Sequence, residues 1–324
     1  MNADRYIGHP SQLYGIEEHR LVGGRGDGMR LLEVKNGLGL EMTVLPDRCA
    51  DISRLTFRGY NMGYFSANGY VSPAYYSDRG NDFLKSFTAG FLTTCGLTAV
   101  GTPCTDGGED LPLHGTIGNT PCDRFSTEID DDALQITAQI SDAHIFGHKL
   151  QLTRRIRCAR TECSFTVTDT VRNRGTAPSP LMLLYHMNMG YPLLSEHAML
   201  EIPSEAVTPR DAHAAEGLAH WAQIPPPTAG FVEQCYYHSF AHGGRARILN
   251  PDIGCGLEIT FGPELDCFTQ WKLMDEVDYV LGLEPGNCLP DGRDVMRRTG
   301  RLKTIAPGEA KTYSVHIALF EPNF

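Results

Sequence analysis

Apolar and polar residues alternate along most of the chain, and this two-residue period predicts extended strands. The clearest run lies between residues 125 and 171, where Leu152 and Val167 are typical of the apolar positions. Asn36-Gly37 is a strong hairpin signal between two further alternating segments. Long antiparallel strands joined by tight turns explain this pattern.

One stretch approximates the 3.6-residue period of a helix instead, through Phe83, Leu84, Phe87, Phe91 and Leu92. It is short, and Gly90 interrupts it. Many short strands with few short helices favour the all-β class and one large antiparallel β-sandwich. No repeat or low-complexity linker divides the chain, so we expect a single domain over residues 1–324, with residues 1–14 as an N-terminal arm.

The charge balance limits the classes of partner. Asp and Glu number 39 against 28 Lys and Arg, a formal net charge of -11 that argues against nucleic acid and anionic membranes. The ten cysteines are scattered without C-x-x-C pairs, which suits a reducing compartment. The N-terminus lacks the pattern of a signal peptide, and no apolar run is long enough to span a membrane. We therefore expect a soluble cytoplasmic protein that acts on a small molecule.

Glu284 lies at the end of an apolar strand and is followed by a turn. Val280, Leu281 and Leu283 are strand-forming residues, and the Pro-Gly-Asn sequence of residues 285–287 stops the strand. A carboxylate held on a strand is positioned accurately, and apolar neighbours raise its proton affinity. Glu284 is therefore either a general base or a surface glutamate that closes an ordinary strand.

A second apolar strand, starting at residues 181–184, also ends in polar residues. It presents Tyr185, His186 and Asn188 in quick succession. Buried polar groups without partners are costly, so His186 and Asn188 must form hydrogen bonds with protein, water or a ligand. His114 lies in a Pro-Leu-His-Gly turn rather than on a core face, which makes it a further candidate for a functional histidine.

Two more segments combine groups that suit sugar binding. Asp47-Arg48 follows a predicted strand and forms either a structural ion pair or planar, bidentate hydrogen bonds to hydroxyl groups. Trp271-Lys272 ends another strand, where the indole either stacks on the apolar face of a sugar or packs in the core.

Other patterns are interpreted as structural. His144 and His148 have the H-x-x-x-H spacing, but a glycine lies between them and no third ligand is evident, so we predict no metal site. The basic run from Arg154 to Arg160 is interpreted as a solvated strand face. Glu233 precedes two tyrosines and either joins a pocket or, as the favoured interpretation, lies outside the site.

Taken in order, several of these motifs resemble the aldose 1-epimerase (galactose mutarotase) family, and more closely its little-characterised bacterial branch. The resemblance spans roughly residues 32–320 and rests on the following segments: Leu45-Pro46-Asp47-Arg48, Leu113-His114-Gly115, Leu184-Tyr185-His186-Met187-Asn188, Trp271-Lys272 and Gly282-Leu283-Glu284-Pro285-Gly286-Asn287. It implies a galactose mutarotase-like supersandwich with an open cleft and no metal or organic cofactor in the chemistry.

The resemblance also implies a reaction, the interconversion of the α and β anomers of a sugar by ring opening and closure. By motif, Glu284 would be the base, His186 the acid, and His114 a hydrogen-bond donor that stabilises developing charge. The residues implied to hold the sugar are Asp47, Arg48, Asn188, Trp271, Lys272 and Asn287.

The sequence departs from the galactose mutarotases at the central motif, which reads Tyr-His-Met-Asn where those enzymes resemble Asn-His-Ser-Tyr-Phe-Asn. The sugar is therefore open, and the charges of Arg48 and Lys272 suggest an anionic one as a hypothesis. A noncatalytic carbohydrate-binding or sugar-sensing protein on the same fold, or another sugar epimerase or isomerase, remains an alternative. The oligomeric state also stays open, with a homodimer as one option.

Overall fold

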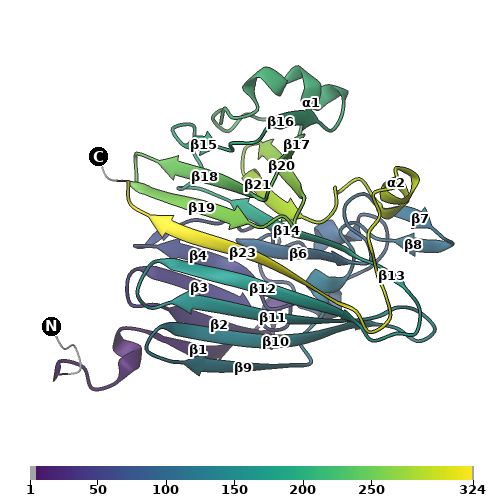
Figure 1. The fold of residues 1–324 in the computed structure, drawn as a ribbon. Helices are drawn as coiled ribbons and strands as arrows, with labels where there is room; N and C mark the ends of the chain where they lie inside the picture. The colour runs from purple at the N-terminus through teal and green to yellow at the C-terminus, as the bar shows by residue number, and fades with distance from the viewer. Residues whose placement is uncertain (1–4, 323–324) are drawn as a thin grey trace.

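Two large antiparallel sheets form the molecule in the computed structural model, which describes residues 5–322 (Figure 1). The larger sheet has eleven strands in the order β1-β2-β3-β4-β6-β14-β21-β20-β17-β16, with β5 paired to β4. Its strands are β1 (Gly15–Arg20), β2 (Arg30–Lys35), β3 (Leu40–Leu45), β4 (Asp51–Phe57), β5 (Tyr60–Asn61), β6 (Leu92–Leu97), β14 (Met182–Met189), β16 (Ala206–Pro209), β17 (Gln234–Ser239), β20 (Cys267–Met274) and β21 (Tyr279–Gly286).

The second sheet has eight strands in the order β15-β18-β19-β23-β12-β11-β10-β9. Its strands are β9 (Arg124–Ile129), β10 (Ala133–Ala143), β11 (Lys149–Ala159), β12 (Ser164–Asn173), β15 (Met199–Glu201), β18 (Gly244–Asn250), β19 (Cys255–Phe261) and β23 (Ala310–Phe320). Two small sheets pair β7 (Cys104–Asp106) with β8 (Glu109–Leu111), and β13 (Ser179–Pro180) with β22 (Thr304–Ile305). The α-helices are α1 (Ala212–Glu216) and α2 (Arg293–Arg298).

The apolar faces of the two large sheets pack against each other, which confirms the predicted antiparallel β-sandwich. One cluster of buried apolar side chains contains residues from both sheets, such as Leu152, Val167, Met187 and Leu283. In β10, β11 and β12 buried residues alternate with more exposed ones, because successive side chains point to opposite faces. By contrast, every residue of β14 and β21 is buried, so both faces of these central strands are covered.

The predicted helix around residues 83–92 is wrong. The structure has only a short 3-10 turn, Asp82–Lys85, followed by a loop and then β6. Ala89 and Gly90 have positive φ angles of 58° and 71°, which a right-handed helix does not accommodate. Phe83, in this turn, and Phe87, in the loop that follows, are buried with ring centroids 5.0 Å apart.

The interpretation of the basic run as a solvated face is wrong for Arg154, which is fully buried, although Arg155 and Arg157 are exposed. Arg154 lies between the sheets, where its guanidinium donates to Asp169 Oδ2 at 2.6 Å and to Asp51 Oδ1 at 2.6 Å. Two carboxylates therefore surround one buried cation and join β4 to β11 and β12.

At the N-terminus, the predicted arm begins with residues 1–4, which lie outside the described residues. The remainder contains a 3-10 turn, Pro10–Gln12, and no residue from 5 to 13 is fully buried. In residues 5–322, none of the helices has the length and apolar character needed to span a membrane.

Candidate active site

The register of the larger sheet brings the predicted acid and base together. Strand β14 pairs with β21 so that Leu184 lies opposite Gly286 and Met187 opposite Leu283, a register that sets His186 opposite Glu284. Residues opposite each other in antiparallel strands point to the same face of the sheet. Both side chains therefore leave the sheet on the same face, opposite to the core that contains Met187 and Leu283.

His186 and Glu284 are in direct contact. Nε2 of His186 lies 3.3 Å from Oε1 of Glu284, and the side chains are only 6% and 2% exposed. The contact has ion-pair distance but lacks hydrogen-bond geometry. Among residues 5–322, Nδ1 of His186 and Oε1 of Glu284 have no hydrogen-bond partner. Because buried polar atoms are nearly always paired, these two atoms are suited to binding a ligand.

His114 joins the pair from a separate segment, the loop after β8. Its ring centroid lies 5.4 Å from that of His186, and its Nδ1 is also buried without a hydrogen-bond partner in the described chain. The backbone of His114 has a φ of 60°, held by hydrogen bonds from His114 N to Gly101 O and from Gly96 N to His114 O. Strained backbone of this kind concentrates at functional sites.

Burial determines where protons reside in this group. Burial lowers the pKa of His186 to about 3 and that of His114 to about 4. Burial also raises the pKa of Glu284 well above its usual range. The neutral forms, a carboxylic acid beside an imidazole, are thus favoured over a carboxylate beside an imidazolium. Both forms contain one proton for the pair, so proton transfer between the two groups does not change the net charge of the site.

A cavity of about 780 Å³ opens onto these three side chains. Its apolar wall includes Phe83, Leu84, Phe87, Leu113, Leu273 and Val280. Its polar wall includes Tyr64, Asn68, Asn81, Arg210, Glu233, Thr269 and Asp278. An apolar enclosure with a few convergent polar groups and perturbed pKa values is typical of a small-molecule site.

One side of the cavity carries a chain of hydrogen bonds that includes Trp271. The indole Nε1–H donates to Glu233 Oε2 at 2.6 Å, and Arg210 Nη2 donates to Glu233 Oε1 at 2.9 Å. The indole is also in contact with His186, with centroids 5.4 Å apart. Because Glu233 holds the indole in place, the interpretation of this glutamate as outside the site is wrong.

The sequence motifs did not identify the other polar residues of the cavity. Arg210, Asn68 and Asn81 come from loops or strand ends distant in sequence from the acid-base motifs, whereas Asp278 directly precedes β21. Their loops contain no spacing that would have singled them out. Only Glu233 had a local signal, the aromatic pair that follows it.

Asp47, Arg48 and Lys272 do not line the cavity, which corrects their predicted role. Asp47 accepts two hydrogen bonds from the guanidinium of Arg30, at 2.9 and 2.5 Å. Arg48 is buried and donates to Val71 O, and burial lowers its pKa to about 10. Lys272 follows Trp271 directly, so strand alternation places its side chain on the opposite face, where it donates to the backbone carbonyls of residues 220, 221 and 223.

The two asparagines predicted to hold the sugar are structural as well. Asn287 accepts a hydrogen bond from Leu183 N at 2.8 Å and donates to Tyr313 Oη at 2.9 Å. Asn188 is fully buried, and its Nδ2 donates to Gly90 O and to His186 O, both at 3.1 Å. Of the six predicted sugar-binding residues, only Trp271 lines the cavity.

Comparisons with known proteins found one matching family and several solved structures with a similar fold. A family model described as a domain of unknown function (DUF4432) matches residues 26–319. A solved structure of a Klebsiella pneumoniae protein, provisionally named an aldose 1-epimerase, is 27% identical with a TM-score of 0.90, covering 99% of this chain and 87% of that one. A search of curated proteins gave no significant match.

Two further solved structures are more distant in sequence. A galactose mutarotase-like protein from Clostridium acetobutylicum is 14% identical with a TM-score of 0.72, covering 96% of this chain and 100% of that one. A galactose 1-epimerase from Lactobacillus acidophilus is 13% identical with a TM-score of 0.65, with the same coverage. These matches confirm the predicted galactose mutarotase-like sandwich and the resemblance to aldose 1-epimerases.

Proposed function

Since the chain belongs to the family described as a domain of unknown function (DUF4432), we propose its function from the cavity: it is an aldose 1-epimerase that interconverts the α and β anomers of a free sugar. The observation that carries the proposal is the contact between His186 and Glu284, which both line the cavity. The name of the Klebsiella pneumoniae protein agrees with this activity.

Mutarotation needs one group that removes the proton of the anomeric hydroxyl and one that protonates the ring oxygen. The two oxygens are bonded to the same carbon, so the base and the acid must lie within a few ångströms of each other. His186 Nε2 and Glu284 Oε1 meet this requirement at 3.3 Å. General acid-base catalysis by positioned side chains contributes about 10²- to 10⁴-fold to a rate.

Glu284 takes the proton from the anomeric hydroxyl, and His186 gives a proton to the ring oxygen. The C1–O5 bond then breaks, the aldehyde rotates, and the same two groups act in reverse to close the ring. The single proton of the pair supplies both roles, because proton transfer from carboxyl to imidazole creates the carboxylate base and the imidazolium acid together. The hydroxyl groups of the bound sugar, rather than water molecules, form the hydrogen bonds that stabilise this charged form.

His114 and Trp271 position the sugar in this proposal. The unpartnered Nδ1 of His114 is a hydrogen-bonding atom for the ring oxygen or a hydroxyl, and a neutral imidazole suits that role. The indole of Trp271, fixed by Glu233, provides a flat face for the C–H groups of the ring.

A neutral sugar fits the cavity better than an anionic one. Arg48 and Lys272, which motivated the anionic hypothesis, do not line it. Arg210 does, but its guanidinium is already paired with Glu233 and Asp211. The acidic side chain of Asp278 also lines the wall, and it would repel an anionic substituent.

Exchange spectroscopy by NMR on a panel of neutral and anionic aldoses tests the proposal. We expect faster anomer exchange for at least one neutral aldose, and a loss of about 10²-fold or more in Glu284→Gln and His186→Asn. The control is His316→Asn, because His316 lies on β23 in the other sheet. Binding of sugars without faster exchange across the panel would contradict catalysis and favour a sugar-sensing protein instead.

A further inference from the structure

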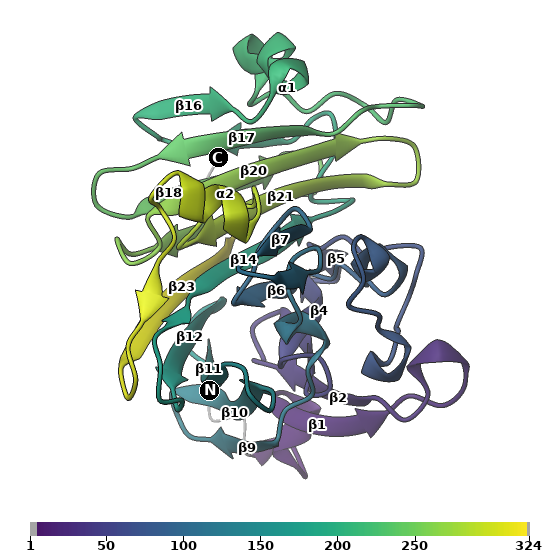
Figure 2. The same ribbon diagram turned by 90° about the vertical axis from the view of Figure 1, so that its right-hand side faces the viewer.

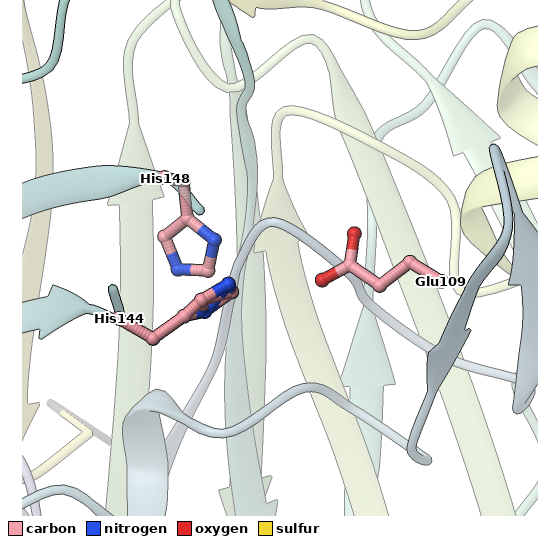
Figure 3. A group of neighbouring side chains, drawn as sticks. All are labelled: Glu109, His144 and His148. Atoms are coloured by element: carbon pink, nitrogen blue, oxygen red, sulfur yellow. The ribbon is translucent and has the colours of Figure 1, made fainter. Parts of the chain in front are cut away.

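A second cluster of ionisable side chains lies outside the cavity, at the end of the sandwich that carries α2 and the β7–β8 hairpin (Figure 2). It consists of Glu109, His144 and His148. One potential ligand atom from each lies within 4.8 Å of the others, and it is the one such group found in residues 5–322. Figure 3 shows the Glu109 carboxylate directed toward the two imidazole rings.

The structure supplies the third ligand that the sequence did not reveal. His144 and His148 lie in the turn between β10 and β11, with ring centroids 4.7 Å apart. Glu109 comes from β8, a separate hairpin, so no local spacing connects it with the histidines. The fold therefore places beside the histidine pair a third candidate ligand that was not evident from the sequence.

The neighbourhood of His148 resembles that of a metal ligand. Nε2 of His148 lies 3.1 Å from Oδ1 of Asp142, a side chain only 8% exposed. Histidines that bind metals usually donate their second ring N–H to a carboxylate in this manner, which fixes the ring and raises its basicity. The contact leaves Nδ1 of His148 as the ligand atom.

Gly147 allows the His144 ring to fold back over the turn. A Cβ at residue 147 would lie 1.7 Å from His144 Nε2, so any other residue would displace the imidazole. Only glycine at position 147 therefore leaves room for the His144 ring in this position.

Charges around the cluster leave one oxygen of Glu109 free for a ligand. Oε2 of Glu109 accepts a hydrogen bond from Arg293 at 2.7 Å, and Arg293 and Arg297 are both paired with Asp106. The ammonium group of Lys149 donates to the carbonyls of His144 and Gly147, both at 3.1 Å. These cations are compensated by protein oxygens, while Oε1 of Glu109 remains for a metal ion.

We propose that Glu109, His144 and His148 bind one Zn²⁺ ion, with Asp142 orienting His148. Two imidazoles and one carboxylate form a ligand set that Zn²⁺ uses, with water at the fourth position. The ion joins the β7–β8 hairpin to the turn between β10 and β11. It thereby anchors the segment that precedes His114, at a distance from the catalytic pair.

Titration calorimetry with ZnCl₂ on the untagged full chain tests the site, together with thermal unfolding. We expect one equivalent to bind and the Tm to rise with Zn²⁺ concentration. His148→Ala and Glu109→Gln should each weaken binding at least tenfold, and Asp142→Asn about 10- to 100-fold. Matched controls are His242→Ala, elsewhere on the surface, and Cys104→Ser, a half-buried thiol at the start of β7, both with unchanged affinity.

Gly147→Ala provides a test that keeps every ligand. It should weaken Zn²⁺ binding at least tenfold without altering the circular dichroism spectrum, because only the His144 ring must move. Co²⁺ in place of Zn²⁺ should give visible d–d bands without thiolate charge-transfer bands.

Three results would overturn the proposal: no binding of Zn²⁺ by the wild type, unchanged affinity in both His148→Ala and Glu109→Gln, or thiolate bands with Co²⁺. Because Lys149 and Arg174 line the same hollow, inorganic phosphate is the rival ligand. Stabilisation by phosphate but not by Zn²⁺ would assign the hollow to an anion. Anomer exchange is not part of this readout, so the test is independent of the proposed function.

Discussion

Glu284 shows how one residue can be suited to catalysis and costly to stability. Its carboxyl group is 2% exposed, and Oε1 has no hydrogen-bond partner among residues 5–322. A buried polar atom that lacks a partner costs about 1–3 kcal/mol. The fold tolerates this cost at the position where a sugar hydroxyl would supply the missing hydrogen bond.

Replacing this carboxyl with an amide is expected to stabilise the folded protein increasingly as pH rises. Burial raises the pKa of Glu284, so the folded protein binds a proton that the unfolded chain loses near pH 4.5. The wild type therefore loses stability as pH rises above this value, by up to about 1.4 kcal/mol per pH unit, until the raised pKa is reached. Glu284→Gln lacks this titration.

Urea unfolding of wild type and Glu284→Gln at several pH values checks this prediction. Glu258→Gln, on the opposite sheet, is the control for removal of an acidic group. A stability difference between Glu284→Gln and wild type that stays constant from pH 4 to 8 would show that Glu284 is ionised in the folded state.

His114 combines a proposed role in catalysis with a strained backbone. Its φ of 60° lies in the left-handed region, which asparagine tolerates better than alanine. We expect His114→Ala to lower the exchange rate about 10²-fold, because the variant loses a hydrogen-bonding group. It should also reduce stability, because alanine is strained at this positive φ. His114→Asn should lower the rate but unfold at nearly the wild-type temperature. Equal losses of Tm in the two variants would contradict the role of backbone strain.

At the scale of elements, the buried ion network around Arg154 supports the strands of the site. Tyr185, the residue before His186, donates from its hydroxyl to Asp169 Oδ2 at 2.9 Å, and Arg154 donates to the same oxygen. Arg154 also donates to Thr94 Oγ1 on β6, the neighbour of β14. The network therefore links both sheets directly behind β14, the strand that carries His186.

Removal of the buried cation is expected to destabilise the protein strongly. Arg154→Met leaves Asp51 and Asp169 buried without their partner, a change that costs about 3–5 kcal/mol. The exposed neighbour gives the matched control, since Arg155→Met should change the free energy of unfolding by less than about 0.5 kcal/mol. Chemical denaturation measures both. Similar values for the two variants would mean that Arg154 is not required between the sheets.

Element prediction succeeded where local pattern and tertiary packing agree. Strands β10, β11 and β12 alternate strictly, and the sequence predicted them. It failed for Phe83 and Phe87, whose spacing imitates a helix although their loop packs them against the cavity. Alternation also cannot tell which face holds a buried charge, and so Arg154 was assigned to solvent.

For the candidate site, the sequence motifs selected three side chains that the structure brings together, but they did not reveal the rest of the wall. His186, Glu284 and His114 meet because strand register and one loop bring them together. Arg210 and Glu233 reach the cavity through long-range contacts that no local spacing encodes. Lys272 was misassigned because it directly follows Trp271, and adjacent strand residues point in opposite directions.

At the scale of the molecule, the sandwich gives β14 and β21 two different environments. One face of these strands packs Met187 and Leu283 into the core, and the other presents His186 and Glu284 to the cavity. The proposed catalytic pair is thus held on two strands in which every residue is buried.

The central claim is that His186 and Glu284 act as one unit that shares a proton. Anomer-exchange rates of Glu284→Gln, His186→Asn and the double variant test it most directly. Residues that act as a unit give non-additive losses, so the double variant should be no slower than the slower single variant. Losses that multiply in the double variant, or a single variant that keeps the wild-type rate, would contradict the shared-proton mechanism.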